Sequence, residues 1–102
     1  MGYPTWRANA PSIYVKELTV GVNSIIPGPG TTIADNIAFK ADRNNDGIIY
    51  VSWQNAGTDE RFGLYAGDSL SSIRITGFDV VRVYASKAAQ KLWIYAELPG
   101  GL

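Results

Sequence analysis

Short stretches in which apolar and polar residues alternate follow one another along most of this chain. Alternation with a period of two is typical of β-strands that bury one face, and these stretches are rich in β-branched and aromatic residues. Turn-forming Gly, Asn, Asp and Ser residues separate them. They cover residues 14–23, 37–41, 48–53, 70–75, 80–85 and 91–98. The pattern predicts an all-β chain that folds as a small antiparallel β-sandwich or barrel.

The first twelve residues lack this alternation. They contain two Pro residues together with Tyr3 and Trp6. We therefore expect an extended N-terminal arm over residues 1–12 and a single β-sandwich domain over residues 13–102. Residues 25–32 hold two Pro and two Gly and should form a loop.

Two irregularities affect this assignment of strands. Ile13 and Val15 are out of phase with Leu18, Val20 and Val22, which predicts either a bulge near residues 16–17 or a change of packing partner there. The segment SKAAQK, residues 86–91, has the composition of one helical turn but lies between two strong strand patterns. We expect it to be the loop of a β-hairpin.

Alternation also predicts which side chains face the core. The expected core residues of three strands are Leu92, Ile94, Ala96 and Leu98; Val81, Val83 and Ala85; and Ile49, Val51 and Trp53. The opposite phase places Tyr50, Tyr84, Trp93 and Tyr95 on outer faces. Four outward aromatics on neighbouring strands would form an apolar patch of the kind that marks an interface. Alternatively, the arm or a second sheet covers them and they belong to a two-sided core. Sugar stacking on Trp93 and Tyr95 is a further alternative.

The composition limits the chemistry that this chain can perform. It has no His and no Cys, the residues most often used to activate nucleophiles, shuttle protons and bind transition metals. Nine basic and nine acidic residues give a net charge of zero, which argues against a nucleic-acid partner. No apolar run is long enough for a membrane span, and the N-terminus lacks the pattern of a signal peptide. We expect a soluble, non-catalytic protein without cofactor or metal.

One segment resembles the first half of a calcium-binding loop. Asp42, Asn44, Asp46 and Gly47 occupy its first, third, fifth and sixth positions, but the twelfth is Trp53 where a bidentate Glu is required. Asn, Asp and Gly also suit a tight hairpin because they tolerate positive φ. We expect a turn without calcium.

Two other groups of residues carry weaker signals. Asp59, Glu60, Asp68 and Asp79 could include a general acid and base pair, but their positions in or beside turns favour local hydrogen bonds. The segment from Gly28 to Thr32 has neither the Lys nor the following helix of a phosphate-binding loop.

From Phe39 onward the order of motifs is FKAD, an Asn-rich link, GIIYVSW, GLYAGDSLSSIRI, VVRVYAS and KLWIYAEL. This order resembles small virion proteins of tailed bacteriophages, in which an IYVG strand, a Gly-rich segment, a VYV strand and a terminal Y-x-A-E strand follow one another. The counterparts here are Ile49 to Ser52, then Gly63, Leu64, Gly67, Asp68, Ser69 and Leu70, then Val81 to Tyr84, and Tyr95 to Glu97. The sequence departs from that pattern at Ser52 and Trp53, which replace a small Gly, and at Tyr65 and Ala66.

The resemblance implies a jelly-roll-like β-sandwich that serves as a capsid decoration (cement) protein or as a head or tail fibre component, usually a trimer without catalysis. We expect a structural virion protein that binds itself and the major capsid protein. It would be located on the capsid surface, and in the host cytoplasm during assembly. The expected interface residues are Tyr3, Trp6 and Arg7 of the arm together with Tyr50, Tyr84, Trp93 and Tyr95. The alternative is a fibre or baseplate module of the tail that binds a host glycan or protein.

Overall fold

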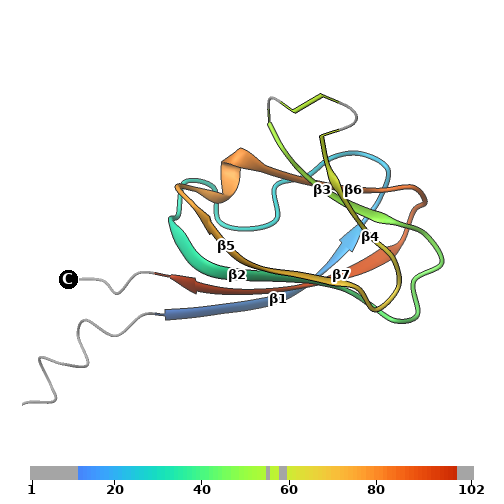
Figure 1. The fold of residues 1–102 in the computed structure, drawn as a ribbon, viewed down its shortest axis with the longest axis horizontal. Helices are drawn as coiled ribbons and strands as arrows, with labels where there is room; N and C mark the ends of the chain where they lie inside the picture. Colours follow the sequence, from blue (N-terminus) through green and yellow to red (C-terminus); the bar gives the residue numbers. More distant parts are fainter. Residues whose placement is uncertain (1–11, 55, 58–59, 99–102) are drawn as a thin grey trace, which may run out of the picture.

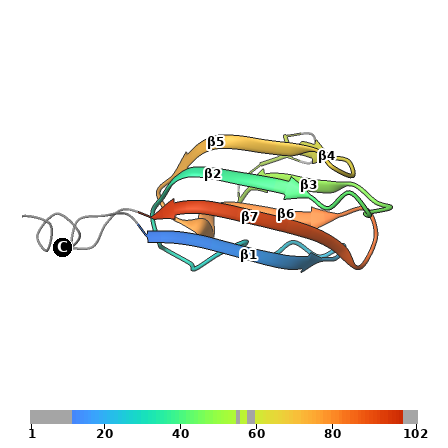
Figure 2. The same cartoon turned by 90° about the horizontal axis from the view of Figure 1, so that it is seen from below.

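Two antiparallel β-sheets pack face to face in the computed structural model, which describes residues 12–54, 56–57 and 60–98 (Figure 1). The four-stranded sheet has the order β1 (Ser12–Val20), β7 (Gln90–Leu98), β2 (Ala34–Ala41) and β5 (Ser69–Ile75), and Figure 2 shows these four strands side by side. The three-stranded sheet has the order β4 (Phe62–Leu64), β3 (Ile49–Trp53) and β6 (Val81–Ala85). A 3-10 turn, η1 (Phe78–Val80), precedes β6. No helix in the described segments has the length and apolar character needed to cross a bilayer. The predicted all-β sandwich is confirmed.

Most connections cross from one sheet to the other. The segment after β1 joins the edge of the three-stranded sheet, where Ile25 and Val83 exchange backbone hydrogen bonds of 2.9 and 3.0 Å. When this bridge is counted as a short eighth strand, the strand order is that of a jelly roll. The loops at 42–48 and 86–89 are therefore corners between sheets, and the prediction of hairpins there is wrong. Sequence patterns locate turns but do not reveal which sheet the next strand joins.

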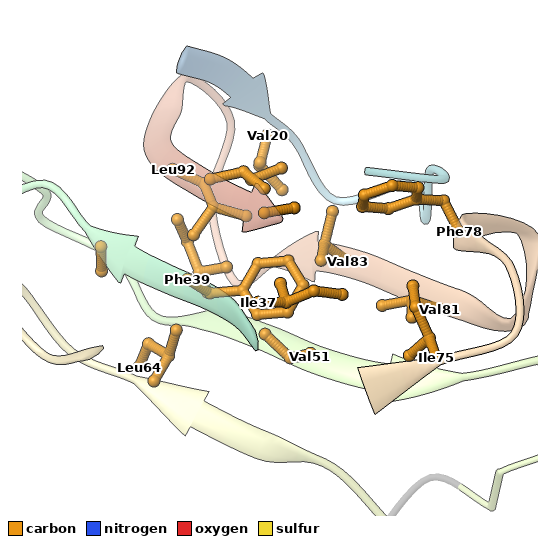
Figure 3. Close-up of a cluster of buried hydrophobic side chains, with 14 of the residues drawn as sticks. Val20, Ile37, Phe39, Val51, Leu64, Ile75, Phe78, Val81, Val83 and Leu92 are labelled. Atoms are coloured by element: carbon orange, nitrogen blue, oxygen red, sulfur yellow. The ribbon is translucent and has the colours of Figure 1, made fainter. Parts of the chain in front are cut away.

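The inner faces of both sheets form one apolar core (Figure 3). Every core residue predicted in β6 and β7 is buried except Leu98, which is half-buried against the cluster. Ile49 and Val51 of β3 are buried as predicted. Trp53 is not, because it ends β3 at an open side of the sandwich, and 44% of its surface is exposed.

The change of phase between Ile13 and Val22 has a simple explanation in the structure. β1 pairs with β7 without interruption from Ser12 opposite Leu98 to Val20 opposite Gln90, so the predicted bulge is absent. Ile13 and Val15 instead lie on the outer face and are 63% and 62% exposed. β1 ends at Val20, so Val22 lies beyond the strand and is exposed.

An irregularity occurs in β2, where the sequence did not suggest one. Ala34 and Ile37 are both buried although they are three positions apart, which strict alternation would place on opposite faces. The extra residue forms a bulge at Asn36, whose φ is 47°, and the register with both neighbouring strands shifts there. Asn is among the residues that adopt positive φ most readily.

The loop between β1 and β2 closes one end of the core. Phe78 is fully buried, and its ring lies 5.7 Å from that of Tyr14, centroid to centroid. Gly28 packs directly on Phe78, since a Cβ at this position would lie 2.6 Å from a ring carbon. The loop therefore requires a residue without a side chain at position 28.

Gly28→Ala should lower the free energy of unfolding by about 1–3 kcal/mol, because the added methyl group must displace the Phe78 ring. Gly30→Ala is the matched control in the same loop, since a Cβ there meets no atom within 4 Å. Urea unfolding of both variants measures the difference. Equal free energies of unfolding for the two variants would show that the Phe78 ring moves aside without an energetic cost.

Candidate interaction surface

The outer face of the four-stranded sheet carries a cluster of exposed apolar side chains. Residues directly opposite each other on paired strands point to the same face of a sheet. Tyr95 lies between Val15 of β1 and Ala38 of β2, and Trp93 lies between Glu17 and Lys40. We call the set Ile13, Val15, Ala38, Trp93 and Tyr95 the outer patch. Trp93 and Tyr95 remain 41% and 37% exposed, and charged residues border them.

Hydrogen bonds hold the polar ends of both aromatic side chains. The Tyr95 hydroxyl donates to Oε2 of Glu97 at 3.0 Å, and Nδ2 of Asn36 donates to Oε1 of the same carboxylate at 3.0 Å. The indole N–H of Trp93 points to Oδ1 of Asp42 at 3.5 Å. With their polar atoms engaged at the sheet, the rings present apolar surface outward.

A hollow of about 410 Å³ lies beside Trp93 and is lined by Lys40, Asp42 and Arg43. Lys40 comes from the end of β2, and Asp42 and Arg43 from the corner that follows it. The hollow therefore combines one indole with two cationic groups and one carboxylate. Such a set can stack on a ring and hydrogen-bond its polar substituents.

The other two predicted aromatics lie on the opposite side of the molecule. Tyr50 of β3 and Tyr84 of β6 pair on the outer face of the three-stranded sheet, with ring centroids 5.2 Å apart. The Arg61 guanidinium lies 3.9 Å from the Tyr50 centroid and donates to the Tyr84 hydroxyl at 3.0 Å. The expectation of one patch built from all four aromatics is therefore wrong, because β7 and the β3–β6 pair belong to different sheets.

The calcium-like segment forms a corner held by its own side chains. Oδ2 of Asp42 accepts the backbone N–H of Asn44 at 3.1 Å, as in an Asx turn. The Asn45 amide bonds to both the N–H and the carbonyl of Lys91, at 2.8 and 2.9 Å. Asp46 accepts from Gln90 and Lys87, and the Gln90 hydrogen bond is the main cause of its lowered pKa. These oxygens are thus engaged within the protein, and no acidic cluster suited to a metal occurs among the described residues.

Gly47 has a different role from the one that turn chemistry suggests. Its φ is not positive. A Cβ there would lie 3.0 Å from the Ser86 hydroxyl and 3.2 Å from Gln90, so Gly47 permits the two corner loops to approach each other. Its N–H donates to the buried Gln90 side chain at 2.8 Å.

The remaining candidates do not combine into a site. Asp68 accepts the N–H of Tyr65 at 3.0 Å within a turn, and Gly28 packs on Phe78. Asp59 and the predicted arm residues Tyr3, Trp6 and Arg7 lie outside the described residues.

Alternation in the last strand located Trp93 and Tyr95 but did not include Ile13 and Val15 in the patch. The sequence nevertheless contains a pattern that predicts an outward position for Ile13 and Val15. Two apolar phases in a single strand, Ile13 and Val15 against Leu18 and Val20, indicate a strand with apolar residues on both faces.

The Tyr95–Glu97 pair should be visible in titrations. The pKa of Tyr95 is raised, mainly by its hydrogen bond to Glu97, and the pKa of Glu97 is lowered, mainly by Asn36. Glu97→Gln should return the Tyr95 pKa towards its usual value of about 10. NMR titration of labelled Tyr and Glu side chains measures both groups. An unchanged Tyr95 pKa in the variant would contradict the hydrogen bond.

The same pair predicts the direction of the pH dependence. Because the pKa of Glu97 is lower in the folded chain than its ordinary 4.5, its contribution to stability is complete above that value. The contribution is lost as the pH falls through the lowered folded pKa. The raised pKa of Tyr95 has the opposite sign, with stability lost as the pH rises through it.

Comparison with known proteins returned no matching family model, no matching curated protein and no matching solved structure. The fold class follows from the two packed sheets. The role of the outer patch must be inferred from its own chemistry.

Proposed function

We propose that this chain is a non-catalytic structural protein that acts through surface contacts, as a decoration (cement) protein of a bacteriophage capsid. The observation that carries the proposal is the outer patch, where Ile13, Val15, Trp93 and Tyr95 are exposed together on one sheet face. The virion setting rests on the resemblance of the chain from Phe39 onward to small phage virion proteins.

The composition of the patch favours contact with protein. Aromatic residues are enriched at the centres of protein interfaces, and a polar border is typical of their rims. Here Glu17 and Lys40 flank Trp93 across the strands, and Glu97 lies beside Tyr95. A net charge of zero also gives little repulsion between copies.

In this proposal the outer patch binds a neighbouring copy, and the assembly bridges adjacent major capsid subunits. The resemblance implies a trimer. The N-terminal residues Tyr3, Trp6 and Arg7 would add anchors from one subunit to the next, which raises affinity through linkage. The protein would function on the capsid surface of the virion after assembly in the host cytoplasm.

A second candidate function is that of a tail fibre or baseplate module that binds a host glycan. The hollow beside Trp93 favours it, because an indole face with Lys40, Arg43 and Asp42 suits a sugar ring with hydroxyl or acidic substituents. The two functions assign different partners to Trp93.

Replacing Trp93 and Tyr95 together with Ser should weaken self-association about thirtyfold or more per residue, since large buried aromatics commonly contribute about 2 kcal/mol each to binding. The fold should survive. Light scattering over a concentration series gives the affinity, and thermal melts give the stability. Tyr50→Ser with Tyr84→Ser is the matched control on the opposite sheet. A Trp93 and Tyr95 variant that keeps its mass would contradict the proposed interface.

Binding to purified capsids should separate the two functions. A cement protein should sediment with phage heads assembled without it and not with host cell envelopes, whereas a glycan-binding module should do the reverse. Lys40→Ala with Arg43→Ala tests the hollow directly, because loss of envelope binding in this variant would favour the glycan partner. Sedimentation with neither particle would contradict both.

A further inference from the structure

The sandwich is open along the side where β5 and β4 form the edges of the two sheets. A cavity of about 150 Å³ lies there, with Phe39 and Val51 lining its interior, Ile73 and Ile75 on the β5 side, and Trp53 and Phe62 near its mouth. Apart from Ser52, every lining side chain is aliphatic or aromatic. We call this feature the edge cleft.

The edge cleft has the size and character of a site for one aromatic side chain. An apolar cavity of about 150 Å³ can hold a ring the size of benzene. Trp53 and Phe62 are 44% and 57% exposed, although the phase of Trp53 directs it towards the space between the sheets. A ring inserted between them would remove this surface from water.

The chain itself contains an occupant within reach. Ser12 pairs with Leu98, Asp35 with Glu97 and Ala34 with Ile75, so the start of β1 and the end of β5 lie at the same end of the four-stranded sheet. Three strand spacings separate them, about 14 Å. Trp6 precedes Ser12 by six residues, which span up to about 20 Å when extended.

The direction of the chain favours the cleft of a neighbouring copy over its own. β1 and β5 are opposite edges of the four-stranded sheet, so a Trp6 that entered its own cleft would have to pass β7 and β2. Pro11 favours an extended conformation at Ala10, which opposes a reversal at this point. We propose that the edge cleft of one copy binds Trp6 of the next copy. This inference rests on the proposed self-association.

Such an exchange is a head-to-tail contact, in which each copy donates Trp6 and receives one. Contacts of this kind close into rings when the rotation between copies allows it. The edge cleft and the outer patch are distinct surfaces, so each can be tested separately.

Because the chain has no Cys, each introduced thiol is unique. Thr5→Cys, beside Trp6, and Gln54→Cys, beside the rim residue Trp53, are made in separate proteins, mixed and treated with a short thiol crosslinker. Gln54 and the control site Ser24 are both exposed, and Ser24 lies beside the Ile25 bridge at the β6 edge, away from the cleft. The expected product is a crosslinked dimer of the two proteins, several-fold more abundant than with Ser24→Cys.

Two results would overturn the proposal. One is a yield equal to the Ser24→Cys control. The other is crosslinking confined to single chains that carry both Thr5→Cys and Gln54→Cys, which would place Trp6 in its own cleft.

Trp6→Ala should weaken association about thirtyfold, as for a central aromatic anchor, and Asn9→Ala, on the same segment, should change it little. A wild-type protein that remains monomeric would overturn both this inference and the proposed self-association. If the wild type associates and the Trp93 and Tyr95 variant dissociates, full affinity in Trp6→Ala overturns the edge-cleft inference alone.

Discussion

Strand β7 is the element on which the rest of the molecule depends. It lies between β1 and β2, and its side chains alternate between the core and the outer patch. A register slip of one residue would turn Trp93 into the core and Ile94 into water. The buried side chain of Gln90, at the start of β7, fixes this register by bonding Gly47 and Asp46 of the corner that leads into β3.

The corner thus joins the two sheets as well as positioning β7. Asn45 bonds both backbone groups of Lys91, and Ser86 accepts the N–H of Ile48 at 2.9 Å. These contacts use the amide and carboxylate groups that make the segment resemble a calcium loop. In the sequence these polar residues look like a set of calcium ligands. In the structure they connect the two corner loops at 42–48 and 86–89, so the side chains available for binding a partner lie on the surfaces of the sheets.

Two apolar features remain exposed after the core is complete, and they differ in kind. The outer patch is a flat sheet face whose aromatic polar ends are already bonded, which suits contact with another folded surface. The edge cleft is a hollow between sheets, which suits a single inserted side chain. The self-association proposed above uses both of them.

The sequence alone determined local structure, because strand and turn preferences act between residues that are near each other in the chain. All six predicted strands, the core faces of β6 and β7 and the outward position of Trp93 and Tyr95 follow from alternation. The short strand β4, the bulge at Asn36 and the partners of each strand did not, since they depend on contacts between distant segments. Only the tertiary structure placed Tyr50 and Tyr84 on the far side from Trp93, and only the packing of the two sheets brought β4 and β5 together around the edge cleft.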